Sequence, residues 1–293
     1  MSRMGDVLAG FHAAWEFDSD SVLIRFERGI RTPKLFQALG ERRIPHEALA
    51  AVTLTPGKRG TVVLHAVPRP GADPLMAAAA GQLKDSSDPY RLVLPAERET
   101  LAEYYADELR ALIGPASDAE EFLVPAPEGP LQFKAYDGKA SFDGRTVSYR
   151  WFWTGASSAK WKAGDQSFAV GDLADVEWRS PEVFDGHLRL LHRAPGGTQP
   201  VQQPAQADQD PAAVVFGLGY GPVHESLPFA AAVLAAVRNS SGPACDDAPR
   251  PAAARRDPAD IADRIRHLGE LHQAGLLTDS EFTSKKAELL AEL

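Results

Sequence analysis

Short runs of apolar or alternating residues recur through the first third of the chain, and their length and pattern predict β-strands. Turns that carry glycine and proline, such as Pro56–Gly60, separate them. The runs lie at Ser21–Phe26, Ala50–Leu54, Thr61–Val67 and Arg91–Leu94. Apolar residues then recur at three- and four-residue spacings, which predicts a closing helix. These residues are Leu101, Tyr104, Tyr105, Leu109 and Leu112.

The same order of features returns about 125 residues later. Four matches occur in chain order: Phe17-Asp18 with Phe142-Asp143, 125 residues apart; Leu49-Ala50 with Leu173-Ala174, 124 apart; Gly60 with Gly186, 126 apart; and Asp88-Pro89 with Asp210-Pro211, 122 apart. Coincidence among short strand patterns is the alternative interpretation. Four matches in one order, with spacings that change only as loops allow, favour a tandem repeat.

The second copy contains the same kinds of element as the first. Its expected strands are Thr146–Trp153, Gln166–Val170, Val176–Trp178, His187–His192 and Val214–Leu218, and its expected closing helix is Phe229–Val237. Several strands followed by one helix indicate an α+β fold. We place the first domain at 1–116 and the second at 122–238. The loop-like segments Pro68–Asp88 and 194–210 are expected to be solvated connections.

The C-terminal segment Pro258–Leu293 predicts a helical hairpin. Asp257 can cap its first helix, Gly275 suits the turn, and Thr278-x-x-Glu281 is a capping box for the second helix. Two apolar stripes make the expected protein-interaction surface, formed by Ile261, Ile265, Leu268, Leu271, Leu277, Phe282, Leu289 and Leu290. So short a pair of helices buries too little by itself, so we expect it to dock on its own chain, on a second copy or on another protein.

Residues 239–257 are rich in Ser, Pro, Ala and charge, and predict a flexible linker before the hairpin. The net charge of −9 counts against broad nucleic-acid binding and against anionic membranes. Cys245 is the single cysteine, and the N-terminus lacks the pattern of a secretion signal. No run is apolar enough to span a membrane. We therefore expect a soluble, cytoplasmic protein.

No motif indicates a catalytic, metal-binding or cofactor-binding site. The eight histidines show no ligand spacing. The run Gly217–Gly221 could present amides to an anion, but its spacing favours a glycine-rich strand exit. Tyr149, Trp151 and Trp153 alternate along one expected strand. They predict either a bulky core or an aromatic groove for a peptide or another apolar partner.

These residues resemble two known families. The run from Phe142 to Trp151, the paired Leu-Ala-x-Val strands and the Asp-Pro strand are similar to the bacterial domain of unknown function 4429, over about residues 10–238. The resemblance implies a pleckstrin-homology-like β-sandwich closed by a C-terminal helix, and it implies no activity or ligand. The hairpin resembles the short C-terminal domain (SHOCT).

The leading hypothesis is a non-catalytic binding or scaffolding protein. It engages an unknown protein partner through its tandem domains and forms homo-oligomers through its hairpin. Two alternatives stay open. One is an enzyme of unknown class with a site near Gly217–Gly221, and the other is a peripheral lipid-binding protein by fold analogy alone.

Overall fold

The computed structural model describes residues 6–114, 117–128, 131–193, 206–217 and 222–240. By its internal contacts the chain divides into Met1–Ala244 and Cys245–Leu293, and every described residue belongs to the first unit. The predicted hairpin Pro258–Leu293 and residues 241–257 of the predicted linker lie outside the described residues. None of the described helices is long and apolar enough to cross a membrane.

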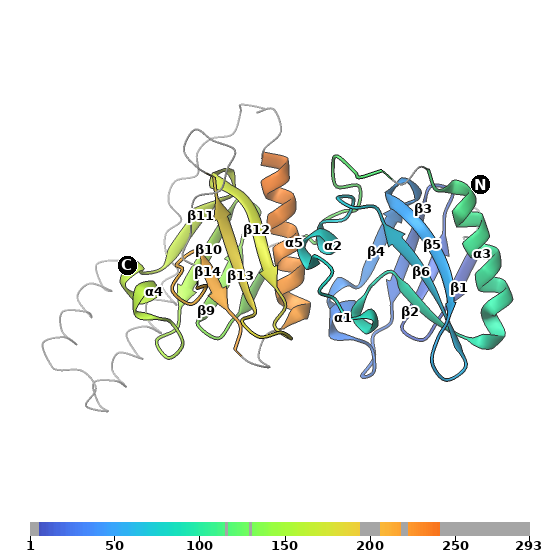
Figure 1. The fold of residues 1–293 in the computed structure, drawn as a ribbon, viewed down its shortest axis with the longest axis horizontal. Coiled ribbons are helices and arrows are strands. Elements are labelled where there is room, and N and C mark those ends of the chain that lie inside the picture. Colours follow the sequence, from blue (N-terminus) through green and yellow to red (C-terminus); the bar gives the residue numbers. More distant parts are fainter. Residues whose placement is uncertain (1–5, 115–116, 129–130, 194–205, 218–221, 241–293) are drawn as a thin grey trace, which may run out of the picture. The chain divides into compact units, whose positions relative to one another are not determined.

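The described part is an α+β structure of two successive β-rich repeats, which we call repeat 1 and repeat 2 (Figure 1). Each repeat has one four-stranded and one three-stranded antiparallel sheet. The strands of repeat 1 are β1 (Asp6–Ala9), β2 (Ala13–Phe17), β3 (Ser21–Phe26) and β4 (Glu41–Pro45) in the first sheet, and β5 (Leu49–Pro56), β6 (Thr61–Pro68) and β7 (Arg91–Pro95) in the second. Those of repeat 2 are β8 (Leu131–Lys134), β9 (Gly138–Phe142), β10 (Thr146–Trp151) and β11 (Gln166–Ala169), then β12 (Leu173–Arg179), β13 (His187–His192) and β14 (Ala213–Val215).

One long helix follows the last strand of each repeat. Figure 1 shows α3 (Glu99–Leu112) beside the strands of repeat 1 and α5 (Val223–Ser240) beside those of repeat 2. A short helix also follows the third strand of each repeat: α1 (Lys34–Leu39) and α4 (Ser158–Ala163).

Backbone hydrogen bonds establish which residues of the two repeats are equivalent. In repeat 1, Phe11 N donates to Val93 O, Glu27 N to His12 O, and Arg69 N to Ala48 O. The equivalent bonds of repeat 2, in the same order, are Tyr136 N to Val215 O, Phe152 N to Asp137 O, and Arg193 N to Asp172 O. The spacing is thus 125 residues in the first strands, 124 around β5 and β6, and 122 at β7. Three of the four matches predicted from the sequence have these spacings.

The predicted match of Gly60 with Gly186 is wrong by two residues. Strand pairing sets Val52 opposite Ala66 and Val176 opposite Leu190, a spacing of 124 on both strands. A shift of two residues leaves the same side chains on the same face of a strand, so the hydrophobic pattern could not detect the error.

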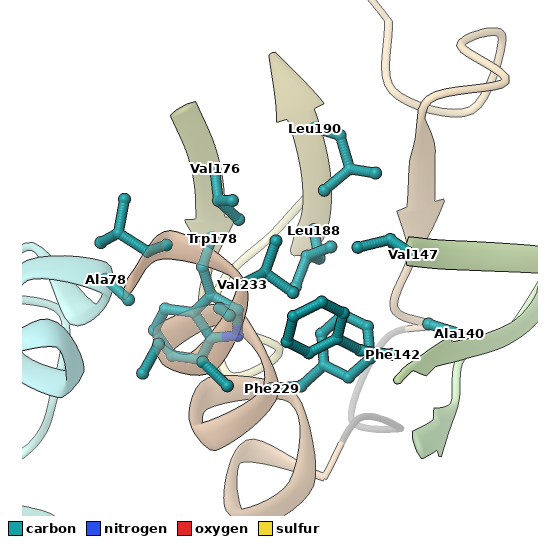
Figure 2. Close-up of a cluster of buried hydrophobic side chains, with 14 of the residues drawn as sticks. Ala78, Ala140, Phe142, Val147, Val176, Trp178, Leu188, Leu190, Phe229 and Val233 are labelled. Atoms are coloured by element: carbon teal, nitrogen blue, oxygen red, sulfur yellow. The ribbon is translucent and has the colours of Figure 1, made fainter. Parts of the chain in front are cut away.

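The closing helices bury equivalent aromatic residues against the sheets. In repeat 1, Tyr105 stacks on Phe17 with ring centroids 4.2 Å apart. In repeat 2, the Phe229 ring meets the Phe142 ring edge-on with centroids 6.1 Å apart, and both residues are labelled in Figure 2. Phe142 is buried, whereas Phe17 is only partly buried at the border of its core.

The buried face of α3 differs from the predicted stripe. Tyr105 and Leu109 face the core together with the small residues Ala102 and Ala106. The other three predicted members are exposed; they are Leu101, Tyr104 and Leu112. Small residues let the helix approach the sheet closely, and a pattern search for large apolar residues passes over them.

The segment Pro68–Asp88, predicted to be a solvated loop, carries a helix that packs on repeat 2. Helix α2 (Pro74–Ala79) is capped by the Asp73 carboxylate, which accepts a hydrogen bond from Leu75 N. The same carboxylate binds Arg42 at 2.8 Å and accepts a hydrogen bond from the Tyr90 hydroxyl at 2.5 Å. This buried network fixes the start of α2.

Repeat 1 contributes side chains to the hydrophobic core of repeat 2. Leu75 and Ala78 of α2 belong to the cluster that surrounds α5, and Figure 2 shows Ala78 near Trp178. The Gln82 side chain donates to Trp178 O and accepts from Ser180 N, each at 2.9 Å. Because α5 is covered by its own sheet and by α2, it is buried nearly all round, which accounts for its apolar, alanine-rich sequence.

Candidate functional site

Three segments meet at one place in each repeat, which we call the corner. They are the turn between the first two strands, the segment that leads into the short helix, and the region around the last strand. In repeat 2, Tyr136 N donates to Val215 O, and Ser157 Oγ donates to Asp208 O. A Cβ atom on Gly155 would lie 2.3 Å from Tyr136 O, so this close approach requires glycine.

A buried ion pair lies at the centre of the corner of repeat 2. Lys160 Nζ is 2.5 Å from Asp137 Oδ2, and the two side chains are 0% and 3% exposed. The other carboxylate oxygen, Oδ1, accepts a hydrogen bond from Val215 N. The ammonium also lies 5.0 Å from the centre of the Trp151 ring, a cation–π distance. The pair therefore ties α4 to the turn before β9 and to β14.

Burial changes the acidity of both groups. It raises the pKa of the Asp137 carboxyl above its ordinary value, and the nearby ammonium opposes that rise. It lowers the pKa of the Lys160 ammonium, against the opposing attraction of Asp137. Desolvation is the larger cause for each group, so each charge is stable in the core only while the other is present.

Three large aromatic side chains are exposed around this pair. Tyr136, Trp153 and Trp161 are 59%, 53% and 48% exposed. The two indole rings pack edge-on with their centroids 4.8 Å apart. Tyr136 precedes Asp137, and Trp161 follows Lys160, so the ion pair positions two of the three rings. We call this set the aromatic platform.

The predicted groove residues fall into two environments. Tyr149 and Trp151 point into the core, and the Tyr149 hydroxyl is buried without a hydrogen-bond partner in the described part of the chain. Burial, followed by the charges of Asp137 and Asp210, raises the pKa of Tyr149 well above its ordinary value. Strand β10 ends at Trp151, so the alternation that placed Trp153 on the same face stops before it.

Helix α4 is defined by local signals. Ser157 caps its N-terminus by accepting a hydrogen bond from Lys160 N. Gly164 ends it at a φ of 69°, a conformation that favours glycine. The Gly164 carbonyl then accepts a hydrogen bond from Trp151 Nε1 at 2.8 Å. These contacts hold Trp161 at the surface.

The corner of repeat 1 is hollow. A cavity of about 340 Å³ lies there, and its walls combine aromatic, cationic and acidic groups. They include Phe11, His12, Arg31, Phe36, Asp85 and Arg91.

Repeat equivalence relates the two corners directly. Phe36 of repeat 1 stacks on Phe26 at 4.7 Å, and the equivalent contact in repeat 2 is that of Lys160 with Trp151. His12 is equivalent to Asp137. The apolar pair and the histidine of repeat 1 are thus replaced in repeat 2 by a cation–π contact and an ion pair.

The repeated Asp-Pro motif has a structural role. Asp88 Oδ1 and Asp210 Oδ1 each accept a hydrogen bond from the amide two residues later, at 2.9 Å. The second oxygen of each carboxylate pairs with a side chain at equivalent positions of β6 and β13, His65 at 3.1 Å and Arg189 at 3.3 Å. The motif shapes the entry into the last strand.

The remaining sequence candidates give no further site. Within the described ranges, no group of three or more His, Cys, Asp and Glu side chains is placed to hold a metal ion. Gly217 lies against the Tyr136 ring, and residues 218–221 lie outside the described ranges. The eight interaction residues predicted in the hairpin, from Ile261 to Leu290, also lie outside them.

Sequence reasoning missed the Lys160–Asp137 pair and Trp161. The position of Lys160 within a short helix gives no sign in the sequence that its side chain is buried, because Lys is among the residues least often buried. A signal was present in the repeat itself. When the two repeats are aligned, Lys160 occupies the position of Phe36, which is buried in repeat 1. A lysine at a position that is apolar and buried in the other repeat indicates an unusual environment.

The fold and corners describe a tandem-repeat α+β protein with two chemically different copies of one site. The chain belongs to the family described as "Domain of unknown function (DUF4429)", whose model matches residues 15–110 and 140–234. This confirms the resemblance seen in the sequence. The "Short C-terminal domain" (SHOCT) model matches residues 263–290, within the predicted hairpin. No curated protein matches the chain.

Proposed function

We propose that this chain is a non-catalytic binding or scaffolding protein that holds a protein partner on the aromatic platform of repeat 2 and self-associates through residues 258–293. The observation that supports the first part is the joint exposure of Tyr136, Trp153 and Trp161 at one corner. Trp and Tyr are enriched in interface centres, where their large area stabilises binding.

The buried ion pair supports a binding role for this corner. Lys160 ties the helix that carries Trp161 to the turn that carries Tyr136. A platform held in this way loses little conformational freedom when a partner binds, which favours affinity. Since Lys160 and Asp137 lie beneath the surface, neither side chain is placed to exchange a proton with a substrate.

We also propose that each repeat is a pleckstrin-homology-like sandwich. The element order supports this, because four antiparallel strands, three further strands and one closing helix follow in that order in both copies. An experimental structure superposed on pleckstrin-homology domains tests the assignment. A different strand connection would contradict it.

The partner site is tested by quantitative affinity capture from the source cells with the full chain as bait. The double variant Trp153→Ala/Trp161→Ala should lose at least about tenfold of a specifically captured protein, since such truncations at interface centres cost ~2 kcal/mol or more. Tyr104→Ala is a matched control, because Tyr104 on α3 is as exposed as Trp153. Equal capture by the double variant, with an unchanged circular dichroism spectrum, would overturn the proposal.

Self-association rests on the apolar stripes of the predicted hairpin, where each buried Leu, Ile or Phe contributes ~1.5–3 kcal/mol before the cost of association. Analytical ultracentrifugation compares the full chain with a chain that ends at Ser240. The full chain should sediment as an oligomer and the shorter chain as a monomer. Leu268→Asp should prevent association by burying a charge, and Thr278→Ala should weaken it modestly. Monomers in every sample would contradict the proposal.

A further inference from the structure

We propose that the cavity at the corner of repeat 1 binds a small organic anion, a carboxylate or phosphate attached to an apolar body. The cavity measures about 340 Å³ and lies within the usual size range of ligand sites. This site is separate from the aromatic platform, and the two proposals stand independently.

The charge of the cavity wall favours an anion. Arg31 and Arg91 line it together with His12, and the acidic side chain in the wall is Asp85. Asp85 pairs with Arg91 at 3.3 Å and is itself largely exposed. Arg31 makes no hydrogen bond or ion pair with the described residues, so its guanidinium is available to a ligand. With Arg91 paired to Asp85, Arg31 leaves the wall with a net positive charge in a chain whose net charge is −9, and this favours an anionic ligand.

The apolar part of the cavity wall favours a ligand that also carries an apolar group. The apolar side chains in the wall are those of Phe11, Ala13, Pro33, Phe36, Leu92 and Val93. The Phe11 ring is about half exposed at the rim, where a ligand would cover it. Placing an apolar body against these side chains while an acidic group meets the arginines uses both parts of the wall.

Comparison with repeat 2 shows that the arginines are specific to this cavity. Arg91 N and Ala213 N make equivalent hydrogen bonds, so Ala213 replaces Arg91 in repeat 2. The segment that leads into α4, Gly155–Ser157, carries no arginine. The equivalent of Phe36 is Lys160, whose side chain is buried there against Asp137. Repeat 2 therefore fills its corner with its own ion pair, whereas repeat 1 leaves an open, basic cavity.

Binding to the full-length protein can be measured by isothermal titration calorimetry and by amide chemical shifts in TROSY spectra. The probes are phenylacetate and phenyl phosphate, with benzyl alcohol as the uncharged analogue. At millimolar concentration both anions should bind saturably and shift the amides of Phe11, His12 and Leu92. Benzyl alcohol should bind at least about tenfold more weakly, because it lacks charge-assisted hydrogen bonds.

Two variants and one control locate the anion. Arg31→Gln and Arg91→Gln should each weaken phenyl phosphate about tenfold or more, since a hydrogen bond to a charged group contributes ~1.5–3 kcal/mol. Arg28→Gln removes a nearby exposed arginine outside the cavity wall and should change nothing. Arg31 is exposed, so its replacement leaves the fold intact. Three results would each overturn the proposal. Neither anion binds; both variants bind phenyl phosphate as tightly as the wild type; or the amide chemical-shift changes are confined to repeat 2.

One further arm identifies the source of the anion. Phosphatidylcholine vesicles with and without phosphatidylglycerol are sedimented with the wild-type protein and with the Arg31→Gln variant. Sedimentation that needs both the anionic lipid and Arg31 assigns the site to a lipid headgroup. Probe binding without vesicle binding assigns it to a free small molecule.

Discussion

Replacing Lys160 by methionine is the sharpest test of the corner of repeat 2. The change keeps most of the side-chain volume and leaves the Asp137 carboxylate buried without its ammonium partner. Breaking a buried ion pair from one side costs ~3–5 kcal/mol, which is a large part of the stability of a domain. The loss is measured as the change in the free energy of unfolding in urea, followed by tryptophan fluorescence and circular dichroism.

The pH dependence of the loss has a definite sign. Burial raises the pKa of Asp137, and removing Lys160 raises it further. A carboxyl whose folded pKa exceeds its unfolded value stabilises the folded state when protonated and loses that contribution as pH rises through the folded pKa. The deficit of Lys160→Met should therefore be smaller at about pH 5 than at about pH 7.

The partner variant should show the opposite trend. Asp137→Asn keeps an acceptor for Val215 N but leaves Lys160 charged and unpaired. Burial lowers the pKa of Lys160, so that group favours folding when neutral, and the contribution is lost as pH falls through the folded pKa. The deficit of Asp137→Asn should therefore shrink as the pH is raised.

A double variant and a control complete the experiment. Asp137→His/Lys160→Phe installs the residues found at the corner of repeat 1, and it should cost less than the more damaging single change, since removing a whole buried pair is often nearly neutral. Lys162→Met, an exposed lysine on the same helix, should stay within ~0.5 kcal/mol of the wild type. Losses below ~1 kcal/mol for both single variants, as for exposed pairs, would refute the reasoning.

Three further predictions concern the fold and can be checked by urea unfolding. Phe142→Ala should cost ~3–5 kcal/mol, and Phe17→Ala should cost clearly less, because Phe17 is only partly buried; equal losses would contradict their different burial. Gln82→Ala removes two hydrogen bonds between the repeats and should cost ~1–3 kcal/mol by leaving backbone groups of Trp178 and Ser180 unpaired, whereas no measurable loss would argue against this contact between the repeats. Gly10→Ala would set its Cβ 2.5 Å from Val93 O and should destabilise repeat 1, while Gly114→Ala, with open space around it, should be neutral; similar effects at both glycines would count against the close approach.

Much of the fold could be predicted from local patterns. The strand runs, the turn at Asp143-Gly144 and the closing helices depend on nearby residues: Asp143 Oδ1 accepts hydrogen bonds from the amides of Arg145 and Thr146, within one turn. The tandem repeat was visible because two copies of one fold must place apolar residues in the same order. The match of Gly60 with Gly186 was the exception. A shift of two residues along a strand leaves the hydrophobic pattern unchanged, so the pattern could not reveal the error.

The candidate sites required the tertiary structure. Whether Trp153 lies in a core or on a surface depends on where β10 ends, and whether Lys160 is buried depends on Asp137, which lies 23 residues earlier in the chain. The cavity of repeat 1 likewise joins segments that the sequence holds apart, from Phe11 to Arg91. The sequence by itself determined the elements and their repetition, because those depend on neighbouring residues. Only the packing of distant segments decided which side chains are buried, paired or left open to a ligand.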